Sequence, residues 1–226
     1  TGHALGFRRE REIEPRLDKG AVPSPLTMTL GMENDPRLEE QLPNYARIVK
    51  DEIDEMVEAG ADEVQLDAPA EATSLVNGTL PAAELLDTLV APFGDVGDVT
   101  RTIHFCLGDI SRRPGTDVQN LSSLMPLLQM LDGLVDRVHV ECSHAGQWAD
   151  RHLFSEIPES IEIIAGIADV KQKPQPVAVL KERIELLLEI VHEDRLLLST
   201  SCGCGRVPHD EAIRLVRNLV KAARNE

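Results

Sequence analysis

Short apolar runs alternate with longer segments of helical period from residue 21 onward, and this alternation constrains the fold more than any other feature. Alternating strands and helices are typical of a parallel sheet covered by helices, either open or closed into a barrel. The sequence therefore predicts an α/β protein. Six strands are predicted, at 25–30, 63–67, 100–106, 137–141, 161–167 and 195–200.

Apolar residues repeat every three or four positions in the segments between these runs, which indicates amphipathic helices. Residues 21–226 contain no low-complexity linker and are predicted to form a single domain, whereas the charged segment 1–20 receives no assigned structure. The predicted helices lie at 36–59, 81–91, 117–131, 148–157, 176–191 and 209–224.

Composition excludes several classes of protein. The formal charge of −16 would repel nucleic-acid phosphates, so we expect no nucleic-acid partner. We expect no membrane span, because no apolar run reaches the length that a bilayer requires. The first residues lack the apolar core of a secretory signal, which favours a cytoplasmic location. In a reducing compartment, the four cysteines favour metal or thiol chemistry over disulfides.

The stretch "TIHFCLGD" places a histidine and a cysteine two residues apart at the end of a predicted strand. Side chains alternate along a strand, so His104 and Cys106 should share one face while Phe105 points to the other. In parallel α/β proteins, ligands gather at the carboxyl ends of the strands. We therefore expect His104 and Cys106 to point together into a binding site.

Two other predicted strands end in residues of similar chemistry. The run "RVHVECSH" ends in Glu141, which should share a face with His139, and "LLLSTSCGCGR" contains Cys202. An imidazole, two thiolates and a carboxylate could together hold a tetrahedral zinc ion. Taken singly, each residue also fits an ordinary structural role, such as a small buried cysteine. The residues alone leave both interpretations open.

A set of motifs in fixed order points to a known family. The order "PSPLT", "EAGADEVQLDAPA", "IHFC", "VHVE", "GIADVK" and "LSTSCG" over residues 21–226 resembles the C-terminal catalytic barrel of the cobalamin-independent methionine synthase family. The resemblance implies a (β/α)₈ barrel of the TIM type, in which the six βα units found here are the third to the eighth. The first two strands would be missing from this chain or supplied elsewhere, by a partner chain or a homo-oligomer.

The resemblance also implies a zinc site and a reaction. Zinc would be held by His104, Cys106, Glu141 and Cys202, and would bind the substrate thiol as a thiolate that attacks an alkyl carbon. Glu141 is the ligand that the incoming thiol is expected to displace. Cys204 is an alternative to Cys202 as the fourth ligand, although Gly203 completes the Cys-Gly pair of the family.

Three further residues are implied at the mouth of the barrel. Asp67 matches the family aspartate that binds the amino group of the substrate, and its alternative role is to order the end of the strand. Asp169 and Lys171, in "GIADVK", are expected near the same mouth as catalytic residues, with Lys171 also binding substrate. For Asp169 a purely structural role is equally compatible with the sequence.

The chain departs from the family pattern at several positions. Ala68 replaces the glutamate of the family's Asp-Glu-Pro block. Lys171 stands where the full-length enzymes have a histidine, and the shorter epoxyalkane:coenzyme M transferases resemble this chain in having a lysine there. No tryptophan follows "PLTMTL", so we expect a methyl donor simpler than polyglutamylated folate. The predicted function is methyl transfer from folate or a simpler donor to homocysteine or a related thiol. The alternatives are an alkyl transferase or lyase acting on coenzyme M, and a zinc-binding subunit that is active only with a partner.

Overall fold

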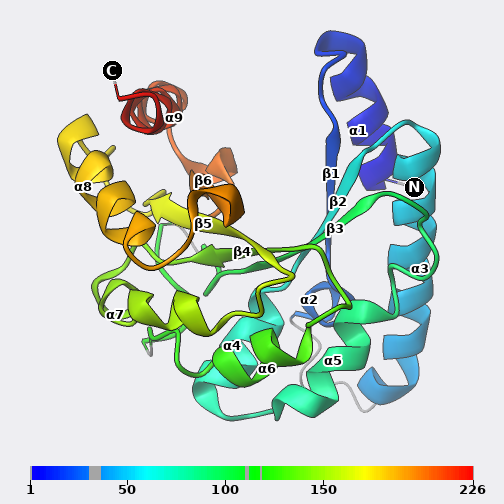
Figure 1. The fold of residues 1–226 in the computed structure, drawn as a ribbon. Helices are drawn as coiled ribbons and strands as arrows, with labels where there is room; N and C mark the ends of the chain where they lie inside the picture. Colours follow the sequence, from blue (N-terminus) through cyan, green and yellow to red (C-terminus); the bar gives the residue numbers. More distant parts are fainter. Residues whose placement is uncertain (1, 31–36, 110–111, 118, 226) are drawn as a thin grey trace.

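The computed structural model describes residues 2–30, 37–109, 112–117 and 119–225. These residues form a parallel sheet of six strands in the order β1-β2-β3-β4-β5-β6 (Figure 1). Across the described residues the sheet is open, with β1 and β6 at its two edges. The strands are β1 (Lys19–Pro23), β2 (Glu63–Asp67), β3 (Thr100–Phe105), β4 (Arg137–Glu141), β5 (Glu162–Ala168) and β6 (Leu196–Thr200).

Helices connect the strands, with α1 and α3 at the β1 end of the sheet and α8 and α9 at the β6 end (Figure 1). The α-helices are α1 (Gly2–Ile13), α2 (Pro25–Met28), α3 (Leu38–Glu58), α4 (Pro69–Asn77), α5 (Ala82–Val90), α6 (Met125–Met130), α7 (Ala145–Ala149), α8 (Val177–Leu188) and α9 (His209–Ala223). Short 3₁₀ helices are η1 (Arg151–Glu156), η2 (Glu193–Arg195) and η3 (Cys204–Arg206). In the part of the chain described, no helix is long and apolar enough to cross a membrane.

The structure confirms five of the six predicted strands and corrects the first. The apolar run at 25–30 begins with the short helix α2, and the strand lies earlier, at Lys19–Pro23. Ser24 caps this helix, because its Oγ accepts a hydrogen bond of 3.0 Å from the Thr27 backbone N–H. Pro25 occupies the first helical position, where a backbone N–H would have no hydrogen-bond partner within the helix.

The predicted helices differ from the observed ones mainly in length. The segment 117–131 is helical only over α6, and 148–157 divides between the end of α7 and η1. The charged N-terminal segment contains α1, which packs against α3 and β1. The division of the chain at residues 20 and 21 stays a prediction.

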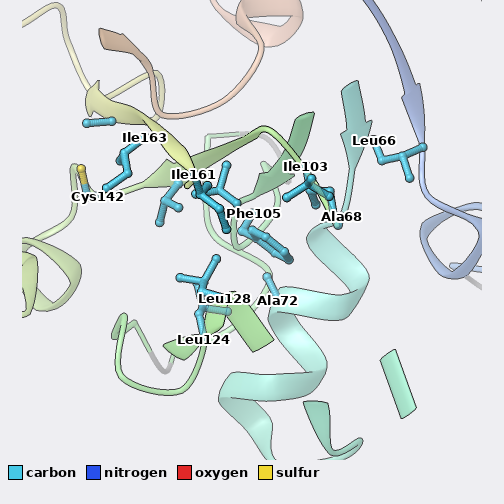
Figure 2. Packing of buried hydrophobic residues seen from close by; sticks show 14 of the residues in the cluster. Leu66, Ala68, Ala72, Ile103, Phe105, Leu124, Leu128, Cys142, Ile161 and Ile163 are labelled. Carbon is cyan, nitrogen blue, oxygen red and sulfur yellow. The ribbon is translucent and has the colours of Figure 1, made fainter. Parts of the chain in front are cut away.

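The apolar core lies between the sheet and the helices that cover it. Figure 2 shows Phe105 pointing from β3 toward Ala72 of α4 and Leu128 of α6. The adjacent residues His104 and Cys106 line a cavity on the opposite face, so the predicted alternation along β3 is confirmed. One face of the sheet thus gains stability from apolar burial while the other is left for polar side chains.

Charged residues are paired on that polar face at the amino ends of the strands. Glu63 forms ion pairs of 2.7 Å with Lys19 and with Arg137, and it accepts a 2.6 Å hydrogen bond from Thr102. Arg137 also contacts Glu162 at 2.5 Å. This network, which we call the basal ion network, connects five of the six strands.

Candidate metal centre

A cavity of about 630 Å³ opens at the carboxyl ends of the strands, on the polar face of the sheet. Its wall includes three of the four predicted metal ligands, His104, Cys106 and Cys202, and also Asp67. Several residues that were not selected from the sequence line it as well: Thr27, Gln65, Asp109, His139 and Arg206.

His104, Cys106 and Cys202 come together at this cavity. Their ligand atoms all lie within 4.8 Å of one another, and the two sulfur atoms are 3.8 Å apart. His104 belongs to β3, Cys106 follows it, and Cys202 follows β6. Among the described residues this is the one group of three or more His, Cys, Asp or Glu side chains so arranged. We call it the His/Cys/Cys group.

The orientation of His104 suits a metal ligand. Its Nδ1 lies 3.2 Å from the backbone oxygen of His139, an acceptor, so Nδ1 carries the proton and donates it. Nε2 is then the ring nitrogen left to bind a metal, and this buried atom has no hydrogen-bond partner within the described residues. Metal-binding histidines usually donate their other ring nitrogen to a carbonyl or carboxylate in this way. Although burial opposes this effect, the adjacent Cys202 raises the pKa of the His104 ring.

The two sulfur atoms differ in acidity. The hydrogen bond from Cys106, together with the nearby His104, lowers the pKa of Cys202 well below that of an ordinary thiol. The same hydrogen bond, with burial, raises the pKa of Cys106. The pair therefore holds one proton between two sulfurs, with Cys202 as the thiolate. A thiolate is the form of cysteine that binds metals.

His139 supports His104 from the neighbouring strand. The two imidazole rings lie 4.0 Å apart between centroids, and the His139 Nε2 donates a 2.9 Å hydrogen bond to the Thr200 backbone oxygen. Burial and the adjacent His104 lower the pKa of His139, so this ring is neutral. His139 was not among the predicted site residues, although its position two residues before Glu141 in "RVHVE" places both side chains on one face of the strand.

Glu141, the fourth predicted ligand, lies outside the His/Cys/Cys group. One carboxylate oxygen accepts a 3.0 Å hydrogen bond from the Leu107 N–H, and the other is paired with the Lys171 Nζ at 2.5 Å. The side chains of Glu141 and Lys171 are only 3% and 9% exposed. Burial raises the pKa of Glu141, and the Lys171 charge opposes this effect.

The three remaining predicted residues have different positions. Asp67 lines the cavity, where Gln65 Nε2 donates a 2.7 Å hydrogen bond to its carboxylate. Asp169 accepts a 2.8 Å hydrogen bond from the Lys171 backbone N–H and orders the loop after β5. Asp169 and Lys171 are not among the residues that line the cavity.

The other cysteines stand apart from the His/Cys/Cys group. Cys204 is half-buried two residues beyond Cys202 and does not join the three converging ligand atoms. Cys142 lies in the apolar core, where burial raises the pKa of its thiol to about 12. The structure therefore brings Cys202 to the group and leaves Cys142 and Cys204 outside it.

Together these features define a class: a parallel α/β domain that carries a thiol-rich candidate metal centre at the carboxyl ends of its strands. Residues 16–225 match the family model described as the catalytic domain of cobalamin-independent synthase, and the chain belongs to this family. The family resemblance read from the sequence motifs is thus confirmed.

Curated relatives agree with this assignment. The chain is 25% identical over 235 residues to the methionine synthase of Methanothermobacter marburgensis, a match covering 96% of this chain and 66% of the relative. It is 24% identical over 229 residues to the methionine synthase of Methanothermobacter thermautotrophicus, covering 94% and 64%. The chain therefore spans slightly less than two thirds of the length of these relatives.

Solved structures support the fold. A B12-independent methionine synthase from Shewanella sp. W3-18-1, in complex with selenomethionine, matches the whole chain with a TM-score of 0.79 and 19% identity. The match covers 66% of that structure. A methyltransferase from Methanosarcina mazei matches 98% of the chain and 63% of its own length, with a TM-score of 0.64 and 17% identity. The predicted barrel-type α/β class is confirmed, with an open sheet over the described residues.

Proposed function

We propose that this chain is the zinc-binding part of a methyltransferase that moves a methyl group onto a thiol, homocysteine or a related compound. One observation carries the proposal: the unpartnered His104 Nε2 lies within 4.8 Å of the Cys106 and Cys202 sulfurs, beside a cavity. The methionine synthases among the relatives support the choice of reaction.

The residues present fit a zinc ion. Imidazole nitrogen and cysteine sulfur are the ligands that zinc prefers, and the buried Nε2 is otherwise without a partner among the described residues. When bound, zinc would lower the pKa of the acceptor thiol and supply it as a thiolate at neutral pH. Before the metal binds, the chain holds Cys202 as a thiolate through its contact with Cys106, and the Cys106 proton would be released when zinc binds both sulfurs. The chain also fixes the His104 ring through the backbone oxygen of His139.

Asp67 supplies the recognition of the acceptor in this proposal. Its carboxylate faces the same cavity as the His/Cys/Cys group, and Gln65 fixes its direction. A carboxylate in that position would bind the ammonium group of an amino-acid thiol by a charge-assisted hydrogen bond. Asp169 acts in this scheme by positioning Lys171, whose ammonium group contacts Glu141.

The methyl donor is proposed to be simpler than polyglutamylated folate. Ala68 removes one carboxylate beside Asp67, and no tryptophan follows "PLTMTL" to pack on a folate ring. A cavity of about 630 Å³ has the usual size for small-molecule sites, which supports two small reactants held together. The cytoplasmic location remains part of this proposal.

A second candidate is alkyl transfer to a thiol with an anionic end, such as coenzyme M. Arg206 favours it, because this exposed residue lines the cavity and its guanidinium donates a 2.9 Å hydrogen bond to the Asp109 backbone oxygen nearby. A guanidinium group pairs well with a sulfonate. The third possibility, a subunit active only with a partner, is supported by the open sheet, whose edges β1 and β6 could pair with further strands.

Metal analysis of matched cysteine variants tests the proposal. We expect one zinc per chain in the wild type, loss of zinc in Cys106→Ser and Cys202→Ser, and retention in Cys204→Ser, the matched control. Full zinc occupancy in both Cys106→Ser and Cys202→Ser would place the metal elsewhere. Loss of zinc in Cys204→Ser alone would show that the other sulfur is the ligand.

A substrate screen then separates the candidate reactions. Homocysteine and coenzyme M are offered separately, each with methylfolate and with small methyl or alkyl donors. Turnover of homocysteine with a small donor supports the leading proposal, and exclusive use of coenzyme M supports the second. Efficient turnover of polyglutamylated methylfolate would contradict the donor proposal. Activity that appears only after a partner polypeptide is added would support the third.

A further inference from the structure

We infer that Thr27 binds the ammonium group of the acceptor amino acid beside Asp67, and that the buried Glu71 positions the Thr27 hydroxyl for this contact. The inference rests on the proposed function, because it assumes that an amino-acid thiol binds in the main cavity. Thr27 and Asp67 both line that cavity, whereas Glu71 contacts Thr27 without lining the cavity itself. Thr27 is thus a binding residue in this inference, and Glu71 is a positioning residue.

Backbone contacts bring Thr27 next to Asp67. Strands β1 and β2 pair so that Pro23 lies opposite Asp67, and the Ser24 N–H donates a 2.8 Å hydrogen bond to the Asp67 backbone oxygen. Helix α2 begins at the next residue and contains Thr27. The Ala70 N–H donates to the Thr27 hydroxyl oxygen at 3.4 Å. Thr27 is therefore held against the first turn of α4, which begins shortly after Asp67.

The Glu71 carboxyl accepts hydrogen bonds from two hydroxyl groups. Its Oε2 lies 2.8 Å from the Ser24 hydroxyl and 3.3 Å from the Thr27 hydroxyl. The Ser24 hydroxyl also lies 2.8 Å from the Thr27 hydroxyl oxygen, but its single proton serves one acceptor at a time. When both hydroxyls donate to Glu71, the Thr27 oxygen keeps a lone pair for a donor in the cavity. An ammonium group is such a donor.

Glu71 is buried at a cost to stability. The residue is 0% exposed, and its Oε1 has no hydrogen-bond partner within the described residues. Burial raises the pKa of this carboxyl to about 7, although the hydrogen bonds from Ser24 and Thr27 oppose the effect. A substrate ammonium group at Thr27 would favour the ionised form of Glu71, because opposite charges attract. Ionisation of Glu71 and binding of the ammonium group therefore support each other.

Other titratable groups near Glu71 have to be separated from it in a test. Helix α4 packs against α2, which contains no titratable side chain, and against β3. Strand β3 carries His104 and also Arg101, which pairs with Asp136 at the amino ends. Asp67 immediately precedes the first turn of α4. A ligand that lacks only the amino group provides the separation, because it leaves all the other pH effects in place.

The test compares the binding of two thiols to the zinc-loaded full chain by calorimetry. The thiols are homocysteine and 4-mercaptobutanoate, which is homocysteine without its amino group. We expect the wild type to prefer homocysteine by about 100-fold at pH 8, because two charge-assisted hydrogen bonds contribute on the order of 10-fold each. This amino-group preference should be smaller at pH 6. Effects of pH on the thiol, on His104 and on zinc act on both compounds and cancel in the ratio.

Variants assign the preference to particular residues. Thr27→Val should reduce it to about 10-fold at pH 8 without weakening 4-mercaptobutanoate, and Thr27→Ser should restore it. Thr29→Val is the matched control, because the Thr29 hydroxyl donates to the Leu26 backbone oxygen at 2.7 Å and does not line the cavity. Its preference should equal that of the wild type. Glu71→Gln should remove the pH dependence of the preference, because an amide does not titrate over this range.

The outcomes distinguish this inference from the proposed function. If Thr27→Val weakens both thiols equally, Thr27 does not bind the amino group and the inference is wrong, while methyl transfer still decides the proposed function. If homocysteine binds with the expected preference but no methyl group is transferred, the proposed function fails and the inference stands. If the wild type binds neither thiol, both are wrong.

A second measurement covers the case in which Thr27→Val does not fold, as judged by circular dichroism. The amino-group preference of Glu71→Gln is then compared with that of the wild type at pH 6 and pH 8. A preference that no longer depends on pH in Glu71→Gln supports the inference. A preference that keeps the wild-type pH dependence contradicts it.

Discussion

Charged side chains at the amino ends of the strands are paired with one another, whereas several buried polar atoms toward the carboxyl ends have no partner within the described residues. At the amino ends, the basal ion network pairs Glu63 with Lys19 and Arg137, and Arg101 makes two hydrogen bonds of 3.0 Å to the Asp136 carboxylate. Toward the carboxyl ends, several buried polar atoms have no hydrogen-bond partner within the described residues. These atoms are Gln65 Oε1, Glu71 Oε1, His104 Nε2 and Asp109 Oδ2.

We interpret the ion pairs at the amino ends as groups that stabilise the fold, and the unpartnered His104 Nε2 at the carboxyl ends as an atom available to bind a ligand. Buried polar atoms without partners reduce stability, so a fold retains them mainly where they serve another purpose. The ion pairs of the amino ends join one strand to another, and of their residues only Lys19 lines the cavity. We therefore expect substitutions at the amino ends to change stability alone, and those in the His/Cys/Cys group to change metal binding.

The largest effect is expected for Cys106→Ser. Removing one of three converging ligands should raise the zinc Kd by at least about 100-fold, because serine does not supply a thiolate. With zinc removed from both proteins, the variant and the wild type should have free energies of unfolding within about 1 kcal/mol of each other, since serine is nearly isosteric with cysteine. Chelator competition and urea unfolding measure the two quantities. A large loss of stability with unchanged zinc affinity would show that Cys106 stabilises the fold and does not bind the metal.

At the other end, Glu63→Ala should lower the free energy of unfolding by about 2 to 4 kcal/mol, because it leaves Lys19 and Arg137 without their shared carboxylate. Zinc affinity should not change. Glu162→Ala is the matched control: its side chain is 38% exposed and contacts Arg137 alone in this network, so a loss of about 1 kcal/mol is expected. Equal losses in the two variants would contradict the assigned role of Glu63.

A pH-dependent effect is expected for Glu71, which is fully buried at the start of α4 and accepts a 2.8 Å hydrogen bond from Ser24. Burial raises the pKa of this carboxyl to about 7. The folded state therefore binds the Glu71 proton more tightly than the unfolded state. Its contribution to stability is present below the unfolded pKa of about 4.3 and is lost as the pH rises toward 7.

Replacing Glu71 by glutamine should remove this pH dependence. The stability of Glu71→Gln relative to the wild type should increase between pH 4.5 and pH 8 by an amount on the order of 3 kcal/mol. Urea unfolding of both proteins at the two pH values measures the difference. A relative stability that stays constant over this range would show that folding does not raise the pKa of Glu71.

The smallest effect is expected for Asp136→Asn. This side chain is 44% exposed, and its pair with Arg101 is correspondingly screened by solvent. We expect a loss of about 1 kcal/mol or less, which decreases further at high salt. Urea unfolding at two salt concentrations measures this dependence. A loss of stability as large as that of Glu63→Ala would show that the exposure of the Asp136 side chain does not weaken its ion pair with Arg101.

The sequence by itself determined the strands whose ends carry the site. The runs 63–67 and 137–141 match β2 and β4 residue for residue, and each is a largely buried strand that follows an aspartate. The pairing of His104 with Cys106 on one face followed from the two-residue period of a strand. The rule that ligands collect at carboxyl ends then led from His104 to Cys202, nearly a hundred residues away.

Only the tertiary structure decided what the side chains contact at those ends. The pairing of Glu141 with Lys171 joins the end of β4 to the loop after β5, and no local pattern encodes a contact across thirty residues. The choice between Cys202 and Cys204 depends on how the chain turns after β6, and the support of His104 by His139 depends on strand register. Backbone periodicity is a local property that a sequence displays directly, whereas the partner of a buried charge is set by packing among distant segments.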